Sequence, residues 1–272
     1  MPHFLCQTCS IQFAESDAPP ARCPICEDER QYVPARGQHW TTLEALRRGH
    51  ANTWRLLEPD LLAIHSLPAI GIDQRALLVR TPAGNLLWNC IALLDDATET
   101  LIRSLGGLTG IALSHPHYYS TMVEWSRAFG VPVWLHAADR QHVTRPDPCL
   151  RFWEGASQPV LPGLTLHHLG GHFAGAAIAH WAAGAAGRGA LLSGDVLQVL
   201  PDRKHLGFMR SYPCLIPLPP TEVRRIADRC AALPFDAIYG AFEGRELATG
   251  GKAALGCSVE RYCAWVAGMV EP

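Results

Sequence analysis

Two kinds of hydrophobic pattern alternate along the chain from about residue 59 onward. Short apolar runs bounded by turn residues predict buried β-strands. These runs include "LLAIHSL" (61–67), "RALLVRT" (75–81) and "NLLWNC" (85–90). The next segment, "DDATETLIRSLGG" (95–107), has helical spacing, with Asp95 or Asp96 as its N-cap and Gly106 and Gly107 at its end.

The same alternation continues to the C-terminus. The strand "GIALSHPH" (110–117) precedes a helix from Thr121 to Phe129, where Thr121-x-x-Glu124 resembles a capping box. Later come "ALLSGDVLQV", a helix after Thr221, the strand "FDAIYGAF" and a helix ending near Val270. Strands followed by a helix, twice over, predict two layered halves, an αβ/βα sandwich.

Residues 1–58 have a different character. Residues 37–58 carry Leu43, Leu46, Leu56 and Leu57 and are predicted to form a helical connector to the main domain, 59–272. Residues 1–36 are polar and too short to build their own core, so they need a covalent or metal staple.

Two CxxC pairs supply that staple. Cys6, Cys9, Cys23 and Cys26 can place four thiolates around one ion, usually zinc. The segment therefore resembles a zinc ribbon with a structural Zn²⁺. Its acidic residues outnumber its arginines, unlike a nucleic-acid-binding ribbon, so we expect no nucleic-acid partner. A protein partner bound through the ribbon is the alternative use of this segment.

Composition narrows the class of protein. Of the 272 residues, 48% are hydrophobic and 18% charged, with a formal net charge of −2, which predicts a globular chain without general attraction to phosphate or anionic lipid. Neither a signal segment nor a membrane span is visible. Ten cysteines without an export signal indicate a reducing compartment, so we expect a cytoplasmic protein of bacterial type.

Three motifs could carry chemistry. His115 and His117 end an apolar strand, where residues two apart share a face and can reach one ion. "LGGHFAG" places His172 between glycines that allow a sharp turn, and "LLSGDV" delivers Asp195 just after a strand.

These motifs, in this order, resemble those of the metallo-β-lactamase superfamily from about residue 60 to the C-terminus. The resemblance implies that family's four-layer αβ/βα sandwich. It also implies that His115, His117 and His172 are the imidazole ligands of the first metal. Asp195 corresponds to the carboxylate that usually bridges two metals in the family.

The ligands of a second metal are missing. The family's fuller motif, His-x-His-x-Asp-His, reads Tyr119 and Ser120 at its last two positions. Its final His falls at Phe242, or at Glu243 if the register shifts by one. Phenol, hydroxyl and phenyl groups do not replace a carboxylate and two imidazoles, so we expect a single ion, Zn²⁺ or Fe²⁺.

One ion held by three imidazoles can lower the pKa of a bound water to about 7. We therefore predict a hydrolase that uses metal-activated water on a small-molecule ester, thioester, lactone or amide. Asp195 would act as a base or fourth ligand, and Tyr119 as a hydrogen-bond donor to an oxyanion, or simply as a packing residue. His136 is a candidate to lie beside the metal ligands without binding the ion. The candidates to line the substrate pocket are Trp153, Phe208, Met209 and Tyr212.

Two alternatives remain. His115, His172 and Asp195 form the two-His, one-Asp set of the family's mononuclear-iron persulfide dioxygenases, which would make the protein a redox enzyme. The chain could also be a non-catalytic or weakly active metal-binding protein whose ribbon docks a partner.

Overall fold

A seven-stranded sheet organises the first of two units into which the chain folds, Met1–Trp153 and Glu154–Pro272. The computed structural model describes residues 1–269. The sheet is antiparallel from β3 to β6 and parallel from β6 to β9. Its strands are β3 (Ala51–Glu58), β4 (Leu61–Leu67), β5 (Ala76–Thr81), β6 (Gly84–Trp88), β7 (Gly110–Ala112), β8 (Val133–His136) and β9 (Leu150–Trp153).

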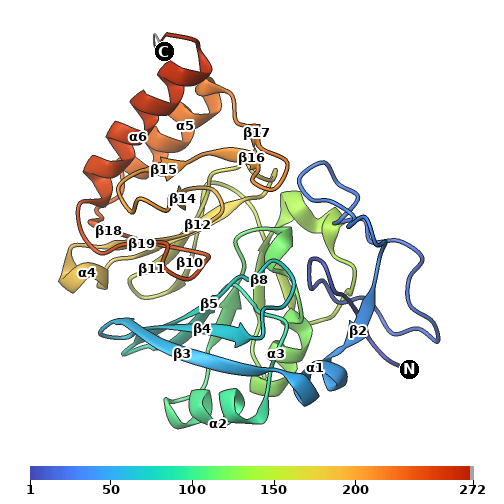
Figure 1. The fold of residues 1–272 in the computed structure, drawn as a ribbon. Helices are drawn as coiled ribbons and strands as arrows, with labels where there is room; N and C mark the ends of the chain where they lie inside the picture. The colour runs from blue at the N-terminus through green and yellow to red at the C-terminus, as the bar shows by residue number, and fades with distance from the viewer. Residues whose placement is uncertain (270–272) are drawn as a thin grey trace. The chain divides into compact units, whose positions relative to one another are not determined.

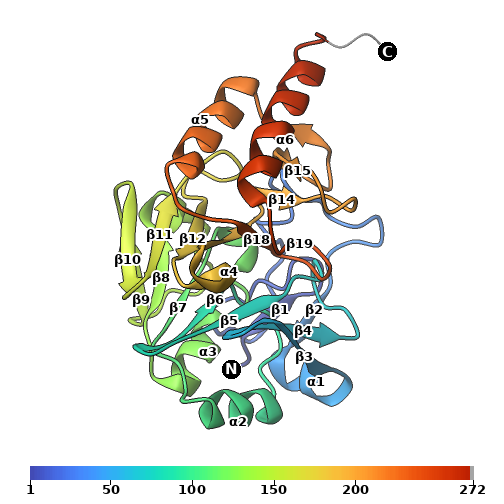
Figure 2. The ribbon, with the colours of Figure 1, turned by 90° about the vertical axis from the view of Figure 1, so that its left-hand side faces the viewer.

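Three helices accompany this sheet: α1 (Leu43–Gly49), α2 (Asp96–Ser104) and α3 (Met122–Phe129). In both ribbon views α2 and α3 lie on the same side of the sheet (Figures 1 and 2). Two 3₁₀ turns, Pro116–Tyr118 and Ala137–His142, follow β7 and β8. The N-terminal strand β1 (Phe4–Cys6) pairs antiparallel with β2 (Trp40–Thr42).

Helix α2 begins and ends as its sequence predicts. The Asp95 side chain accepts a hydrogen bond from Thr98 N at 2.8 Å and a second from Asn52 N at 3.1 Å. The first bond satisfies one of the amides that a helix start leaves without an intrahelical partner. At the other end, Gly106 and Gly107 adopt positive φ angles and stop the helix.

The capping box predicted for α3 is wrong, although the helix itself is present. Thr121 Oγ1 donates instead to the carbonyl oxygens of Ile91 and Ala92, both at 3.0 Å. Glu124 pairs with Arg145 rather than reaching back to the helix start. Hydrogen bonds to residues distant in sequence have therefore replaced the predicted bonds at the start of the helix. At its other end, Gly130 adopts the left-handed conformation and stops the helix.

The helical connector predicted for 37–58 is only partly correct. Helix α1 ends at Gly49, and Ala51–Glu58 is the strand β3, an edge of the sheet paired with β4. Pairing with β4 satisfies the backbone groups on one side of this edge strand, and local leucine spacing cannot reveal that partner. Leu56 is 65% exposed, so the leucines do not form the single buried face assumed for a helix.

The second unit contains a six-stranded sheet in the order β10-β11-β12-β13-β18-β19, in which only β13 and β18 are parallel. Its strands are β10 (Ser157–Leu161), β11 (Leu164–His168), β12 (Ala177–Trp181), β13 (Ala190–Gly194), β18 (Ala237–Gly240) and β19 (Glu246–Leu247). Two short hairpins complete the strands: β14 (Gln198–Val199) with β15 (Leu206–Gly207), and β16 (Met209–Ser211) with β17 (Ile216–Pro217).

The helices of this unit are α4 (Gly184–Gly187), α5 (Pro220–Ala231) and α6 (Gly251–Val266). Helices α5 and α6 run side by side (Figures 1 and 2). Val223, Ile226 and Cys230 of α5 and Leu255 and Val259 of α6 join one buried cluster. The helix after Thr221 and the strand within 235–242 are confirmed.

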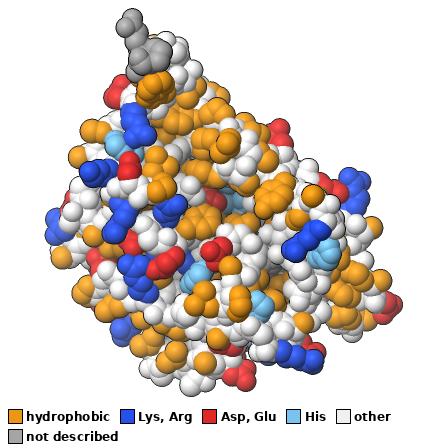
Figure 3. Space-filling view, viewed as in Figure 1, with side chains coloured by type: hydrophobic (Ala, Val, Ile, Leu, Met, Phe, Trp, Pro, Cys, Tyr) orange, Lys and Arg blue, Asp and Glu red, His pale blue; other side chains and the backbone are white. Residues whose placement is uncertain are grey.

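No helix within residues 1–269 combines the length and apolar character that crossing a bilayer requires. On the face shown in Figure 3, basic and acidic side chains are interspersed. This mixture agrees with the net charge of −2.

Asp95→Ala should lower the free energy of unfolding by about 1–2 kcal/mol, because it removes the α2 cap and the bond to Asn52 N. Urea unfolding followed by circular dichroism measures this change. Asp96→Ala is the matched control, since Asp96 lies exposed in the first turn and its loss should cost less than half as much. Equal losses in the two variants would contradict the assigned cap.

Candidate metal centres

The four cysteines of the N-terminal segment converge as predicted. One ligand atom from each of Cys6, Cys9, Cys23 and Cys26 lies within 4.8 Å of the others. Sγ of Cys6 lies 3.5 Å from Sγ of Cys26, and Sγ of Cys9 lies 3.6 Å from Sγ of Cys23. Tetrahedral zinc with Zn–S bonds near 2.3 Å would set such sulfurs about 3.8 Å apart, so the cluster fits this ion.

Backbone turns hold these thiols in place. Ser10 N donates to Cys6 O at 2.8 Å, and Glu27 N donates to Cys23 O at 3.1 Å. All four cysteines are free thiols and buried. Burial raises the pKa of the Cys9 thiol well above its ordinary value, so a cation is needed to hold a set of thiolates here.

The His-x-His pair is positioned by a turn rather than by a strand. Strand β7 ends at Ala112, so the predicted alternation along a strand is wrong. His115 is extended, and Pro116 starts the 3₁₀ turn that contains His117. The fixed φ of Pro116 favours this turn, which brings the two imidazole centroids to 5.1 Å.

Polar contacts orient His115. Its Nδ1 lies 2.9 Å from Ser114 Oγ, and Ser114 N donates to Asn89 Oδ1 at 2.9 Å. Since Nδ1 is engaged, coordination by His115 would use Nε2. Anchoring the second ring nitrogen in this way is typical of metal-binding histidines.

His172 is held by the glycine-rich loop that the sequence singled out. Gly170 and Gly171 have φ angles of 70° and 80°, and a Cβ on Gly171 would lie 2.9 Å from Ile226 Cδ1. The loop therefore needs glycine both for its backbone and for its packing. His172 Nδ1 donates to Met209 O at 3.0 Å, which leaves coordination to Nε2.

Asp195 directly follows β13 and is 3% exposed. Together with His115, His117 and His172 it forms a group whose ligand atoms all lie within 4.8 Å of one another. Every member is buried. All four predicted ligands therefore come together. A buried carboxylate among three imidazoles is a donor set suited to a divalent cation, so these residues fit a metal.

The positions where a second metal would need ligands have other contacts. Tyr119 is buried in the core of the first unit, and burial, with the charge of Asp139, raises its pKa well above the ordinary value. Ser120 Oγ donates to Ser10 O at 3.1 Å. Neither Phe242 nor Glu243 belongs to the ligand group. A catalytic contribution from Tyr119 stays a prediction, as a neutral donor only.

Of the predicted pocket residues, Met209 and Tyr212 line a pocket of about 440 Å³ in the second unit. Phe208 is fully buried in that unit's core, and Trp153 packs edge-on against His136 at 4.5 Å. Sequence reasoning missed the α6 side of the pocket, which includes Arg261, Tyr262 and Trp265. The weak amphipathic pattern of α6 offered no signal for it.

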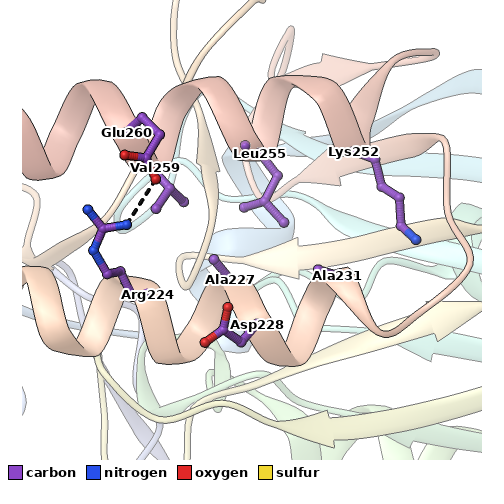
Figure 4. A pocket seen from close by; sticks show the side chains of 9 residues that line it. Arg224, Ala227, Asp228, Ala231, Lys252, Leu255, Val259 and Glu260 are labelled. Carbon is purple, nitrogen blue, oxygen red and sulfur yellow. Dashed lines mark hydrogen bonds and ion pairs between the residues drawn. The ribbon is translucent and has the colours of Figure 1, made fainter.

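The pocket touches the backbone that holds two candidate ligands. Tyr212 Oη lies 3.1 Å from Asp195 O, and Met209 O receives the proton of His172 Nδ1. A second hollow, of about 500 Å³, lies between α5 and α6, where the Arg224–Glu260 ion pair spans it (Figure 4). None of the candidate metal ligands lines this second hollow.

The amino-acid sequence of the chain is similar to that of one curated protein. No family model matches the chain. "Uncharacterized protein YmaE" of Bacillus subtilis (strain 168) is 47% identical over 244 residues, which are 89% of this chain and 89% of YmaE. The chain belongs to the YmaE family. That name states no activity, so the relationship assigns no chemistry to the two candidate centres.

Solved structures establish the fold of this YmaE-family chain. The metallo-β-lactamase DIM-1, exposed to ceftazidime, matches with a TM-score of 0.58 at 13% identity, over 79% of this chain and 97% of that one. A Cronobacter sakazakii metallo-β-lactamase with a HARLDQ motif matches at 0.51, with 18% identity and 79% and 93% coverage. TTHA1623 in a di-iron-bound form matches at 0.51, with 22% identity and 68% and 95% coverage.

These matches show that the chain has the metallo-β-lactamase fold, which confirms the predicted αβ/βα class. The four-Cys cluster near the N-terminus and the His/Asp group are both present in it.

Metal analysis of the purified protein should find two ions per chain, one for each ligand group. Cys9→Ser should remove the ion of the four-Cys cluster, because three thiolates hold zinc far less tightly than four. Cys257→Ser is the matched control, since Cys257 is exposed and belongs to neither group. Mass spectrometry under native conditions counts the ions, and a count of three would contradict the single-ion His/Asp site.

Proposed function

We propose that this YmaE-family chain is a metal-dependent hydrolase with one ion in its His/Asp group and a structural zinc in its four-Cys cluster. One observation carries the proposal: three imidazoles and a carboxylate, all buried, place their ligand atoms within 4.8 Å of one another. Burying such groups is costly without a cation, so this arrangement is unlike an incidental cluster of surface histidines.

The donor set supports one ion rather than two. TTHA1623 was solved in a di-iron-bound form, whereas the second-metal positions of the metallo-β-lactamase motif here hold Tyr119, Ser120 and Phe242, or Glu243 if the register shifts by one. Three imidazoles and one carboxylate suit Zn²⁺, and Fe²⁺ is the alternative.

When bound, the cation would lower the pKa of a water molecule and polarise the substrate carbonyl. The chain's own residues orient the imidazole rings that would hold the cation. Ser114 and the Met209 carbonyl fix two of the rings through their Nδ1 atoms. The carboxylate of Asp195 is proposed to accept a proton from water, and the protonated phenol of Tyr119 is proposed to donate to a developing oxyanion.

The proposed substrate class rests on carbonyl chemistry and on a pocket that none of the four candidate ligands lines, although its residues Met209 and Tyr212 bond to His172 and to the Asp195 carbonyl. Esters, thioesters, lactones and amides all react through a carbonyl carbon attacked by water. The pocket beside Met209 and Tyr212 is mainly apolar, with the guanidinium of Arg261 among its lining groups. A small molecule with an apolar portion next to its carbonyl fits this pocket best.

His115→Ala and His172→Ala should each reduce hydrolysis of a responsive ester or lactone at least 100-fold, because each loses one of the metal's imidazole ligands. His205→Ala is the matched control, since the His205 imidazole bonds to exposed Asp202 and belongs to neither ligand group, so its loss should leave turnover unchanged. Steady-state rates on a panel of esters, thioesters, lactones and amides provide the measurement.

Turnover that survives both ligand variants would refute the assignment. Oxygen consumption with persulfide by iron-loaded protein, and no hydrolysis, would instead establish the dioxygenase alternative.

A further inference from the structure

We propose that the four-Cys segment positions the loop that carries His115 and His117, so that the ion bound by the cysteines strengthens ion binding by the histidines. The link is a direct contact between Ser10, next to Cys9, and Ser120, three residues after His117. This inference rests on the proposed function only in taking the His/Asp group to bind an ion.

The contact joins two strained, buried residues. Ser120 Oγ donates to Ser10 O at 3.1 Å and lies 3.3 Å from Ser10 Oγ, while Gln12 N donates to Ser120 O at 3.3 Å. Ser10 and Ser120 have φ angles of 62° and 35°, which are unfavourable for residues with a Cβ. Such conformations are energetically unfavourable and persist only when neighbours hold them.

The path from cysteine to histidine is short on both sides. Ser10 N donates to Cys6 O at 2.8 Å, so the first CxxC turn fixes the serine that faces the loop. On the other side, Tyr119 N donates to Pro116 O at 3.1 Å, which makes the turn from His115 to Tyr119 a rigid unit. A displacement of Ser120 would therefore also displace His117.

A buried polar network keeps the segment against the loop. Gln12 accepts a hydrogen bond from Arg145 and donates through Nε2 to Glu124 Oε1 at 3.3 Å. Arg145 is 4% exposed and also pairs with Glu124 at the start of α3. Thr144 Oγ1 donates to Gln12 O at 2.7 Å. Removing the segment would take Gln12 away from the buried Arg145–Glu124 pair and from the Thr144 hydroxyl, so these bonds favour the docked arrangement.

One of the residues used for docking, Ser120, stands where the metallo-β-lactamase motif has a second-metal ligand. Ser120 occupies the place of the motif's last histidine and binds the ribbon instead. Two-site coupling of this kind is reciprocal, because each ion stabilises the same loop conformation. The hydrogen bonds from the four-Cys segment thus supply part of the ordering of this loop that a second ion would otherwise supply.

The test measures Zn²⁺ affinity of the His/Asp group in the full-length protein by competition with a chromogenic chelator. Ser120→Gly removes the hydroxyl and tolerates the positive φ, and Cys9→Ser empties the thiol cluster. Each should weaken the affinity about tenfold, in the range seen when groups supporting metal ligands are lost. Asp95→Ala is the control, since it destabilises the same unit by removing bonds to Thr98 and Asn52, neither of which belongs to the contact, and it should change the affinity less than twofold.

Hydrogen–deuterium exchange supplies a readout that does not need an ion in the His/Asp group. Peptides covering 114–122 should exchange at least tenfold faster in Ser120→Gly than in Asp95→Ala. If the wild-type His/Asp group binds no Zn²⁺, the proposed function fails while the exchange result still tests the contact. Unchanged exchange at 114–122 in Ser120→Gly, or unchanged affinity in both Ser120→Gly and Cys9→Ser, would overturn the inference.

Discussion

The burial of four polar ligands in one place is the constraint on which the rest of the molecule depends. His115, His117, His172 and Asp195 are removed from water and crowd within 4.8 Å. A carboxylate in such surroundings is costly unless positive charge compensates it. The surrounding loops therefore have to hold the rings in one orientation, through Ser114 at His115 and through the Met209 carbonyl at His172.

Loops after parallel strands carry three of these four groups, whereas His172 follows β11, which is antiparallel to both of its neighbours. His115 follows β7, which is parallel to β6 and β8, and Asp195 follows β13, which is parallel to β18. The carboxyl ends of parallel strands are where α/β sheets present functional groups. Proline and glycine then set the local paths: Pro116 starts the turn with His117, and Gly171 leaves room for Ile226 beneath the His172 loop.

The N-terminal segment is part of the first unit rather than an appendage to it. All four cysteines belong to the same buried cluster as Ile64 and Trp125 of the sheet unit. Its polar contacts go to the residues that follow the His-x-His pair. Ser120 hydrogen-bonds to this segment, and the apolar cluster and the hydrogen bonds act together to keep the contact.

Chemically distinctive spacings and strong periodicities were readable from the sequence by itself. The CxxC pairs, the ligand motifs, the α2 cap and the αβ/βα order depend on residues close together in the chain or on local patterns. Only the tertiary structure decided the strand at Ala51–Glu58, the bonding of Thr121, the burial of Phe208 and the contact of Ser10 with Ser120. Each of these depends on a partner distant in sequence, whose hydrogen bonds or packing outweigh the local preference.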